Sequence, residues 1–277
     1  MIKILVDSSS DITTSRLQQD NMVMVPLRIQ IDGKDYLDRK ELEVNHFYDI
    51  LQTTKVFPKT SQPAPQDYIE CFEQAKENND TLLCIMLSSA LSGTYQSALL
   101  AKSIVEYDNI YIIDSLSISF GIELLANQAI KMLNEGKTMD EIVACLDEMK
   151  KKITIYACPE TLDYLCMGGR VDKASAIIGN LAKVKPIISV VDGKVEVVSK
   201  VLGNIKAMNY MLKQIENIPV NKEHKVACVY TQGLKNCDKL EAKLNEIGVS
   251  VDQKVQLGPV VGSHIGPEAF GIIYLRA

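Results

Sequence analysis

Hydroxyl side chains gather at three places where an apolar run of the sequence ends. These clusters are DSSSD (7–11), LSSALSGTYQSA (87–98) and DSLSIS (114–119). Free N–H groups and the positive end of a helix stabilise an anion, and small side chains let the anion approach them. Serine is also a common N-cap. The pattern therefore predicts either capped helices or a neutral site for a small anion.

Two loops supply the best candidates for such a site. In LSSALSGT, the serines Ser88, Ser89 and Ser92 precede a helical pattern together with Gly93, and in KTSQPAP (59–65), Thr60 and Ser61 precede another. Any of these residues can simply cap a helix or start a turn. If the two loops meet in the fold, they form a small anion site lined by neutral hydroxyls.

Arg170 and His264 are the further candidates. Arg170 follows two glycines in CMGGRV, where it can form a surface or structural salt bridge or bind a carboxylate or phosphate. His264 lies in GPVVGSHIGPEAFG, on a predicted turn between two apolar strands. A histidine there is costly to bury without a partner, so it either bonds to a backbone carbonyl or donates into a ligand site.

A serine hydrolase remains an alternative. The G-x-S-x-G motif is absent, and GSHIG places Ser263 beside His264 rather than opposite it. Catalytic triads are defined by geometry, however, so Ser92, His264 and Asp114 can still form one. A non-enzymatic protein that binds a small carboxylate is a third possibility.

Several other classes of function are disfavoured. The sequence has neither G-x-G-x-x-G nor G-x-x-x-x-G-K-[ST], and its three histidines are widely separated, so we expect no nucleotide cofactor and no metal. The net charge of −5 argues against a nucleic-acid partner. The seven cysteines include no C-x-x-C pair, which favours reduced thiols in the core.

Alternating strand and helix patterns predict an α/β fold. Apolar runs at 2–6, 22–31, 81–87 and 109–114 are separated mostly by amphipathic segments, which is typical of a parallel sheet flanked by helices. Ligands bind at the carboxyl ends of such strands, where the hydroxyl clusters lie. Pro65 suits the first turn of a helix, and Thr138 with Glu141 predicts a capping box.

The second half of the sequence predicts a smaller α/β lobe. It begins with a β-hairpin turning at Asp192-Gly193. Helices are expected at 204–216 and 236–248, and strands at 224–231, near 255–262 and at 269–275. We expect an N-terminal domain at 1–155 and a C-terminal lobe at 156–277, closely packed because no long linker separates them.

The N-terminus lacks the pattern of a secretory signal, and no apolar run reaches the roughly 18 residues of a membrane span. We therefore expect a cytoplasmic protein.

Six blocks in order carry a more specific resemblance. The chain is similar to the DegV family of bacterial fatty-acid-binding proteins across residues 3–273, through VDSSSDIT, KTSQPAP, LSSALSGTYQSA, IDSLSISFG, GGRV with IIGNLAKVKPI, and GPVVGSHIGPEAFG. The resemblance implies a two-domain fold that holds a long-chain fatty acid, with the acyl chain in an apolar tunnel and the carboxylate on the hydroxyl loops.

The resemblance also assigns roles. Thr60 and Ser92 match the family's carboxylate-binding positions, and His264 matches its histidine; Ser61, Gly93, Ser263 and Arg170 lie in matching motifs as supporting residues. It implies a carrier rather than an enzyme, which presents the acid to a separate fatty acid kinase for phospholipid synthesis, with peripheral membrane contact during lipid exchange. One departure is Leu202-Gly203, where relatives often carry an Arg thought to help dock the kinase.

Overall fold

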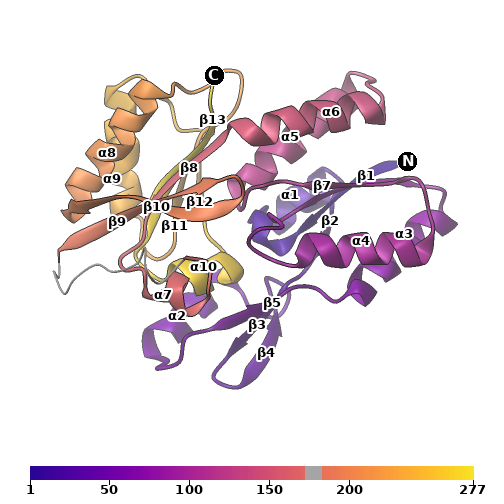
Figure 1. Ribbon diagram of the computed structural model, residues 1–277, viewed down its shortest axis with the longest axis horizontal. Helices are drawn as coiled ribbons and strands as arrows, with labels where there is room; N and C mark the ends of the chain where they lie inside the picture. The colour runs from indigo at the N-terminus through magenta and orange to yellow at the C-terminus, as the bar shows by residue number, and fades with distance from the viewer. Residues whose placement is uncertain (172–182) are drawn as a thin grey trace.

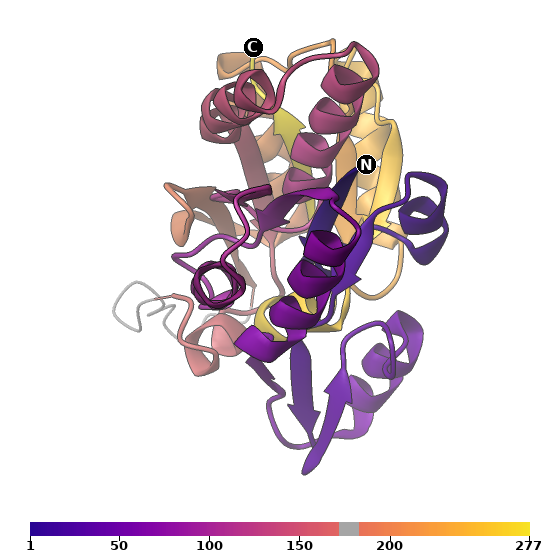
Figure 2. The same cartoon turned by 90° about the vertical axis from the view of Figure 1, so that its right-hand side faces the viewer.

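The computed structural model describes residues 1–171 and 183–277, and within them the chain is a mixed α/β protein built on three sheets. Figure 1 shows a parallel sheet on the N-terminal side, a larger mixed sheet opposite it, and a small sheet below both. The view in Figure 2 shows the small sheet projecting from the rest of the molecule.

The parallel sheet confirms the fold expected for the first half. Its order is β2-β1-β6-β7, from β1 (Ile2–Asp7), β2 (Val23–Val25), β6 (Thr81–Met86) and β7 (Ile110–Asp114). Alternate side chains of a strand point to opposite faces, so Cys84 packs under α3 (Pro65–Glu77) and α4 (Thr94–Val105), whereas Leu83 and Ile85 pack toward α5 (Phe120–Asn134). The short elements Ser8–Ser10 (3-10) and α1 (Thr14–Gln19) follow β1, and α6 (Met139–Met149) with a 3-10 turn at Lys150–Lys152 follows α5.

The single strand expected at 22–31 is wrong, because the chain leaves the parallel sheet at Pro26. Proline has no N–H to donate to a ladder. The next strands form an antiparallel sheet of order β4-β3-β5, from β3 (Arg28–Ile31), β4 (Lys34–Leu37) and β5 (Lys59–Ser61), with α2 (Val44–Thr53) between β4 and β5 in sequence. The small sheet therefore holds Thr60, opposite Ile29 of β3.

The larger sheet has the order β10-β9-β8-β13-β11-β12. Its strands are β8 (Ile153–Cys158), β9 (Val184–Val191), β10 (Lys194–Leu202), β11 (Ala227–Tyr230), β12 (Gln253–Gln256) and β13 (Phe270–Leu275). Figure 1 shows α8 (Gly203–Asn217) and α9 (Lys235–Glu246) on the outer side of this sheet. Tyr156 and Cys158 pack in the cluster with these helices, while Ile155 and Ala157 belong to the main core on the other face. Residue 155, the expected domain boundary, lies within β8.

The predicted local signals are confirmed at three places. The hairpin turns at Asp192 and Gly193, which have φ of 47° and 79°, as a two-residue turn requires. Pro65 occupies the first turn of α3, and Thr138 and Glu141 form the capping box of α6.

Two short helices complete the fold, and one of them replaces a strand that the sequence predicted. They are α7 (Asp163–Met167) and α10 (Pro259–Ile265), which pack against each other. The strand expected near 255–262 ends at Gln256, and Pro259 opens α10 because its fixed φ suits a first helical turn. His264 is therefore on a helix and not on a turn between strands.

Candidate functional site

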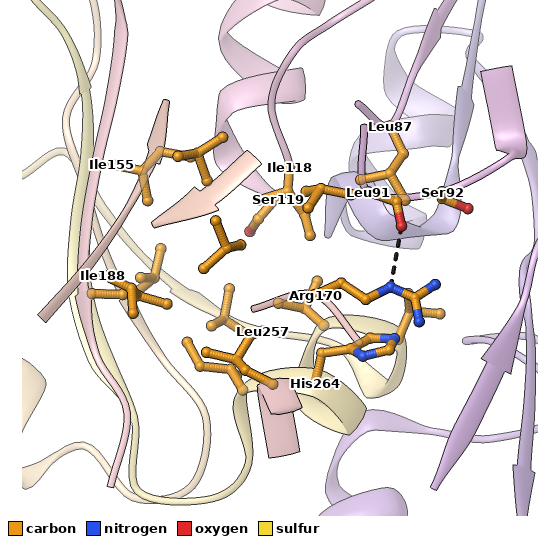
Figure 3. Close-up of a pocket in the computed structure, with 18 of the residues that line it drawn as sticks. Leu87, Leu91, Ser92, Ile118, Ser119, Ile155, Arg170, Ile188, Leu257 and His264 are labelled. Carbon is orange, nitrogen blue, oxygen red and sulfur yellow. Dashed lines mark hydrogen bonds between the residues drawn. The ribbon is translucent and has the colours of Figure 1, made fainter. Parts of the chain in front are cut away.

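A deep pocket lies where the three sheets meet. Figure 3 shows its side chains converging from the inner face of the larger sheet, from the loops after β6 and β7, and from α10. The space between the lining atoms amounts to about 780 Å³, including the part open to solvent. Apart from five polar residues, the described lining is aliphatic: Leu27, Leu87, Leu91, Ile118, Ile155, Ala157, Leu165, Ile188, Val190, Val195, Val229, Leu257, Val260, Val261, Ile265 and Ile273.

Four of the polar lining residues are ones that the sequence singled out: Thr60, Ser92, Arg170 and His264. They come from β5, the loop before α4, the residues after α7, and α10. In Figure 3, Ser92, Arg170 and His264 lie on one side of the pocket, and Ile155 and Ile188 lie on the other. The fold thus brings residues that are far apart in sequence to one end of an aliphatic pocket.

Thr60 and His264 form a hydrogen bond at this polar end. Thr60 Oγ1 lies 2.7 Å from His264 Nε2. Burial, with a smaller contribution from the charge of Arg170, lowers the pKa of His264 from 6.5 to about 4, so the imidazole is neutral at pH 7. When Nε2–H donates to Thr60, the Thr60 hydroxyl is left to donate to a ligand.

His264 is held on its other side by the end of α7. A Cβ atom at Gly168 would collide with the imidazole ring, so the absence of a side chain there makes room for it. The ring's Nδ1 is buried and has no hydrogen-bond partner among the described residues. This is consistent with the tautomer in which Nε2 carries the proton and Nδ1 does not.

Ser92 precedes α4 and is half-buried. Its hydroxyl lies 2.8 Å from Thr94 Oγ1 and accepts a hydrogen bond of 3.3 Å from the Thr94 N–H. Gly93, and not a serine, is the N-cap residue of α4. Ser92 thus sits beside the N-terminal end of a long helix and is one of the residues that line the pocket.

The two hydroxyl loops do meet. Gln62 Nε2, in the KTSQPAP loop, donates to Ser97 Oγ of α4 at 3.2 Å. The Gln62 side chain also occupies the space that a Cβ atom at Gly93 would need. Gly93 thereby allows the close approach of the two loops without lining the pocket itself.

Arg170 brings a positive charge to the polar end. Its Nε donates to the Leu91 carbonyl at 3.2 Å (Figure 3), and its Nη1 donates to the Gly168 carbonyl. Partial burial lowers its pKa, and no carboxylate among the described residues lies within ion-pair distance of it. The salt bridge considered from sequence is thus absent from the described part of the chain.

The remaining predicted positions lie outside the lining. Ser61 is exposed on β5, and the buried Ser263 donates to the Pro259 carbonyl within α10 at 2.7 Å. Leu202 is exposed at the end of β10, and Gly203 begins α8 with φ of 76°. Residues 177–182 of the predicted IIGNLAKVKPI block lie outside the described residues.

The proposed hydrolase triad is not assembled. His264 Nε2 bonds to Thr60, while the Asp114 carboxylate accepts hydrogen bonds from the Ser89 N–H and hydroxyl and from the Leu116 N–H. No hydrogen bond within the described residues links Ser92, His264 and Asp114 to one another.

Ser119 is the fifth polar lining residue, and the sequence did not single it out. Its hydroxyl donates to Asp11 Oδ2 at 2.5 Å, and Asp11 Oδ1 accepts a hydrogen bond of 2.8 Å from the Gly258 N–H at the start of α10. The available signal was the DSLSIS cluster, which places Ser119 near the carboxyl ends of the parallel strands.

Among the residues that the structure describes, no group of three or more His, Cys, Asp and Glu side chains is arranged to hold a metal ion. Every described helix falls short of the length and apolar character needed to cross a bilayer.

Comparisons with known proteins agree with the fold. The sequence model of the family described as "Uncharacterised protein, DegV family" matches residues 1–277. A DegV domain-containing protein of Caldanaerobacter subterraneus is 34% identical over 275 residues, covering 99% of this chain and 98% of the relative. A DegV lipid-binding protein of Thermotoga maritima is 32% identical, with a TM-score of 0.87 over 99% of this chain and 98% of that one. A stearic-acid-binding protein of Eubacterium ventriosum is 28% identical, with a TM-score of 0.90 over 100% and 98%.

Proposed function

Because the chain belongs to the DegV family, we propose that it binds a long-chain fatty acid in the pocket described above. The carboxylate lies at the polar end, where Thr60 and Ser92 bind it and His264 supports Thr60, and the acyl chain follows the aliphatic lining. The observation that carries this proposal is the division of the pocket, whose donors gather at one end while the lining elsewhere is almost entirely aliphatic.

The donors suit a carboxylate. Each carboxylate oxygen accepts more than one hydrogen bond, and such charge-assisted bonds are stronger than neutral ones. Thr60 and Ser92 supply hydroxyl hydrogens, His264 fixes the orientation of Thr60, and Arg170 offsets the charge from close by. Ser61, Gly93 and Ser263 shape the loops and α10 around these donors.

The aliphatic lining favours a long-chain acid over a small carboxylate. Each buried CH₂ group contributes about 0.8 kcal/mol, so a long chain gains far more from this lining than a short one does. The fatty-acid and lipid ligands of the similar proteins support the same choice.

The experiment that tests the proposal identifies the ligand that copurifies with the protein. The protein is purified from a bacterial host without added lipid and denatured, and the solvent extract is analysed by mass spectrometry. A near-stoichiometric long-chain fatty acid is expected. A protein that comes out empty and takes up no added stearic acid would contradict the proposal.

We propose further that the protein is a carrier that presents its fatty acid to a separate kinase. The support is the family resemblance together with the absence of a nucleotide motif in the sequence. Mixing the loaded protein with a bacterial fatty acid kinase and ATP should then yield acyl phosphate, and omitting either protein should yield none. Leu202→Arg, which introduces the arginine that the family resemblance implies at this place, should increase the rate; an unchanged rate would argue against docking through this position.

A further inference from the structure

Ser119 stands apart from the other polar lining residues. In Figure 3 it lies beside Ile118, away from Arg170, His264 and Ser92. If the carboxylate occupies the polar end, Ser119 lies along the path of the acyl chain. A hydroxyl at that place is unexpected in a site for a plain hydrocarbon chain, which offers it no hydrogen bond.

The hydrogen bonds of Ser119 leave its oxygen able to accept one. Its hydroxyl hydrogen is committed to Asp11 Oδ2 at 2.5 Å, and its N–H donates to the Ser9 carbonyl at 2.8 Å. No described group donates to Ser119 Oγ, although a hydroxyl oxygen has two lone pairs. Ser119 therefore acts toward the pocket as an acceptor.

The orientation of this acceptor is fixed by the backbone. Ser119 has φ of 55°, a conformation that is uncommon for residues other than glycine, and it is 1% exposed. Asp11 is itself held by the Gly258 N–H at 2.8 Å. The Ser119 hydroxyl hydrogen thus stays hydrogen-bonded to Asp11 Oδ2, while the lone pairs of Ser119 Oγ remain available to a ligand.

We propose that Ser119 lets the pocket take long-chain fatty acids that carry a hydroxyl group along the chain, in addition to unsubstituted ones. The ligand's hydroxyl donates to Ser119 Oγ, so it is not buried without a partner. This inference rests on the proposed fatty-acid site and names a further class of ligand for it.

The expected selectivity follows from the cost of an unpaired hydroxyl. Burying one among aliphatic side chains weakens binding about tenfold or more, and a hydrogen bond to Ser119 recovers that loss. Only a hydroxyl at the right distance from the carboxylate reaches Ser119. An unsubstituted acid loses little affinity from lying beside Ser119, because the one hydrogen of the Ser119 hydroxyl is already bonded to Asp11.

The test compares stearic acid with hydroxystearic acids that differ in hydroxyl position. Affinities are measured by calorimetry for the delipidated protein, for Ser119→Ala, and for Ser119→Gly, which tolerates the positive φ. Ser117→Ala is the matched control, because this buried serine lies two residues away and does not line the pocket. Binding of stearic acid by each variant reports that the site is intact.

One isomer should bind the original protein within about threefold of stearic acid, and both Ser119 variants should lose about tenfold for that isomer alone. The Ser117 variant should keep both affinities. Two results would overturn the inference without contradicting the fatty-acid site: every hydroxy acid binds tenfold or more weakly than stearic acid, or the Ser119 variants change the affinity for both ligands equally. Failure of the original protein to bind stearic acid at all would instead contradict the proposed function itself.

Discussion

At the scale of single residues, the Thr60 hydroxyl should contribute directly to ligand affinity. Thr60→Val keeps the shape of the side chain but removes its hydroxyl, and it also leaves His264 Nε2 without its partner at 2.7 Å. Charge-assisted hydrogen bonds are worth about 1.5–3 kcal/mol, so stearic acid should bind roughly 10- to 100-fold more weakly. Calorimetric titration measures the change. Thr60→Ser keeps the hydroxyl and should stay near the original affinity; equal losses in both variants would count against the bond.

His264 leads to a prediction about pH. Burial lowers its pKa to about 4, so the imidazole is already neutral at pH values well below its ordinary pKa of 6.5. If it acts as a neutral donor, affinity for stearic acid should change by no more than about twofold between pH 6 and pH 8. A site that needed the imidazolium at its ordinary pKa would lose about tenfold per pH unit above 6.5. Titrations across this range separate the two.

Sequence alone predicted part of the site. Hydroxyl loops before helices are visible in sequence, and the family resemblance singled out Thr60 and Ser92 within them; both residues line the pocket. The role of Ser119 could not be read in the same way, since it depends on its meeting Asp11, 108 residues away in the chain. Contacts between distant segments are set by packing, which a local pattern does not encode.

At the scale of elements, single prolines decided where the predictions of strands and helices failed. Alternation of strands and helices predicted the parallel sheet, yet Pro26 divides one expected strand between two sheets. Pro259 likewise turns an apolar stretch, read as a strand, into the helix that holds His264. Both prolines were visible in the sequence. Whether a proline bends, ends or starts an element depends on what its neighbours pack against.

The end of α7 should control the position of His264. In Gly168→Ala, the added methyl would collide with the imidazole ring and push it away from Thr60. Affinity for stearic acid should fall about tenfold, while the free energy of unfolding changes by only about 1–3 kcal/mol. Calorimetry and chemical denaturation measure the two quantities.

Gly169→Ala is the control for that experiment. Gly169 has φ of 71° and open space around it, so alanine there strains the backbone without touching His264. It should destabilise the fold by about 1 kcal/mol and leave affinity unchanged. If both variants weakened binding equally, general strain at the end of α7 would explain the effect better than displacement of the ring.

At the scale of the whole molecule, two buried aspartates join parts of the chain that are distant in sequence. Asp7 Oδ2 accepts the Leu87 N–H at 2.6 Å, and Asp11 reaches Ser119 and Gly258. A third aspartate, Asp38, follows β4 and is fully buried. Neither of its oxygens has a well-formed hydrogen bond within the described residues, although Ser8 lies near enough to offset part of the burial.

Asp38 should make stability depend on pH. Burial, opposed by Ser8 and reinforced by the charge of Asp11, raises the pKa of Asp38 from 3.8 to about 8. Between these values the folded protein keeps a proton that the unfolded chain releases, so its contribution to stability is lost as the pH rises from about 4 to about 8. Asp38→Asn removes this dependence, because an amide does not titrate.

The free energy of unfolding of Asp38→Asn should therefore rise relative to that of the original protein as the pH rises, by on the order of 1 kcal/mol per pH unit. This gap between the two free energies should be small near pH 4. Chemical denaturation at a series of pH values measures the gap. Asp35→Asn, at an exposed site on β4, is the matched control and should leave the gap constant. Asp11, whose pKa burial raises to about 6, adds a similar but narrower dependence that both proteins share. A gap that stays constant for Asp38→Asn would mean that Asp38 is ionised in the folded protein, with a partner strong enough to offset its burial.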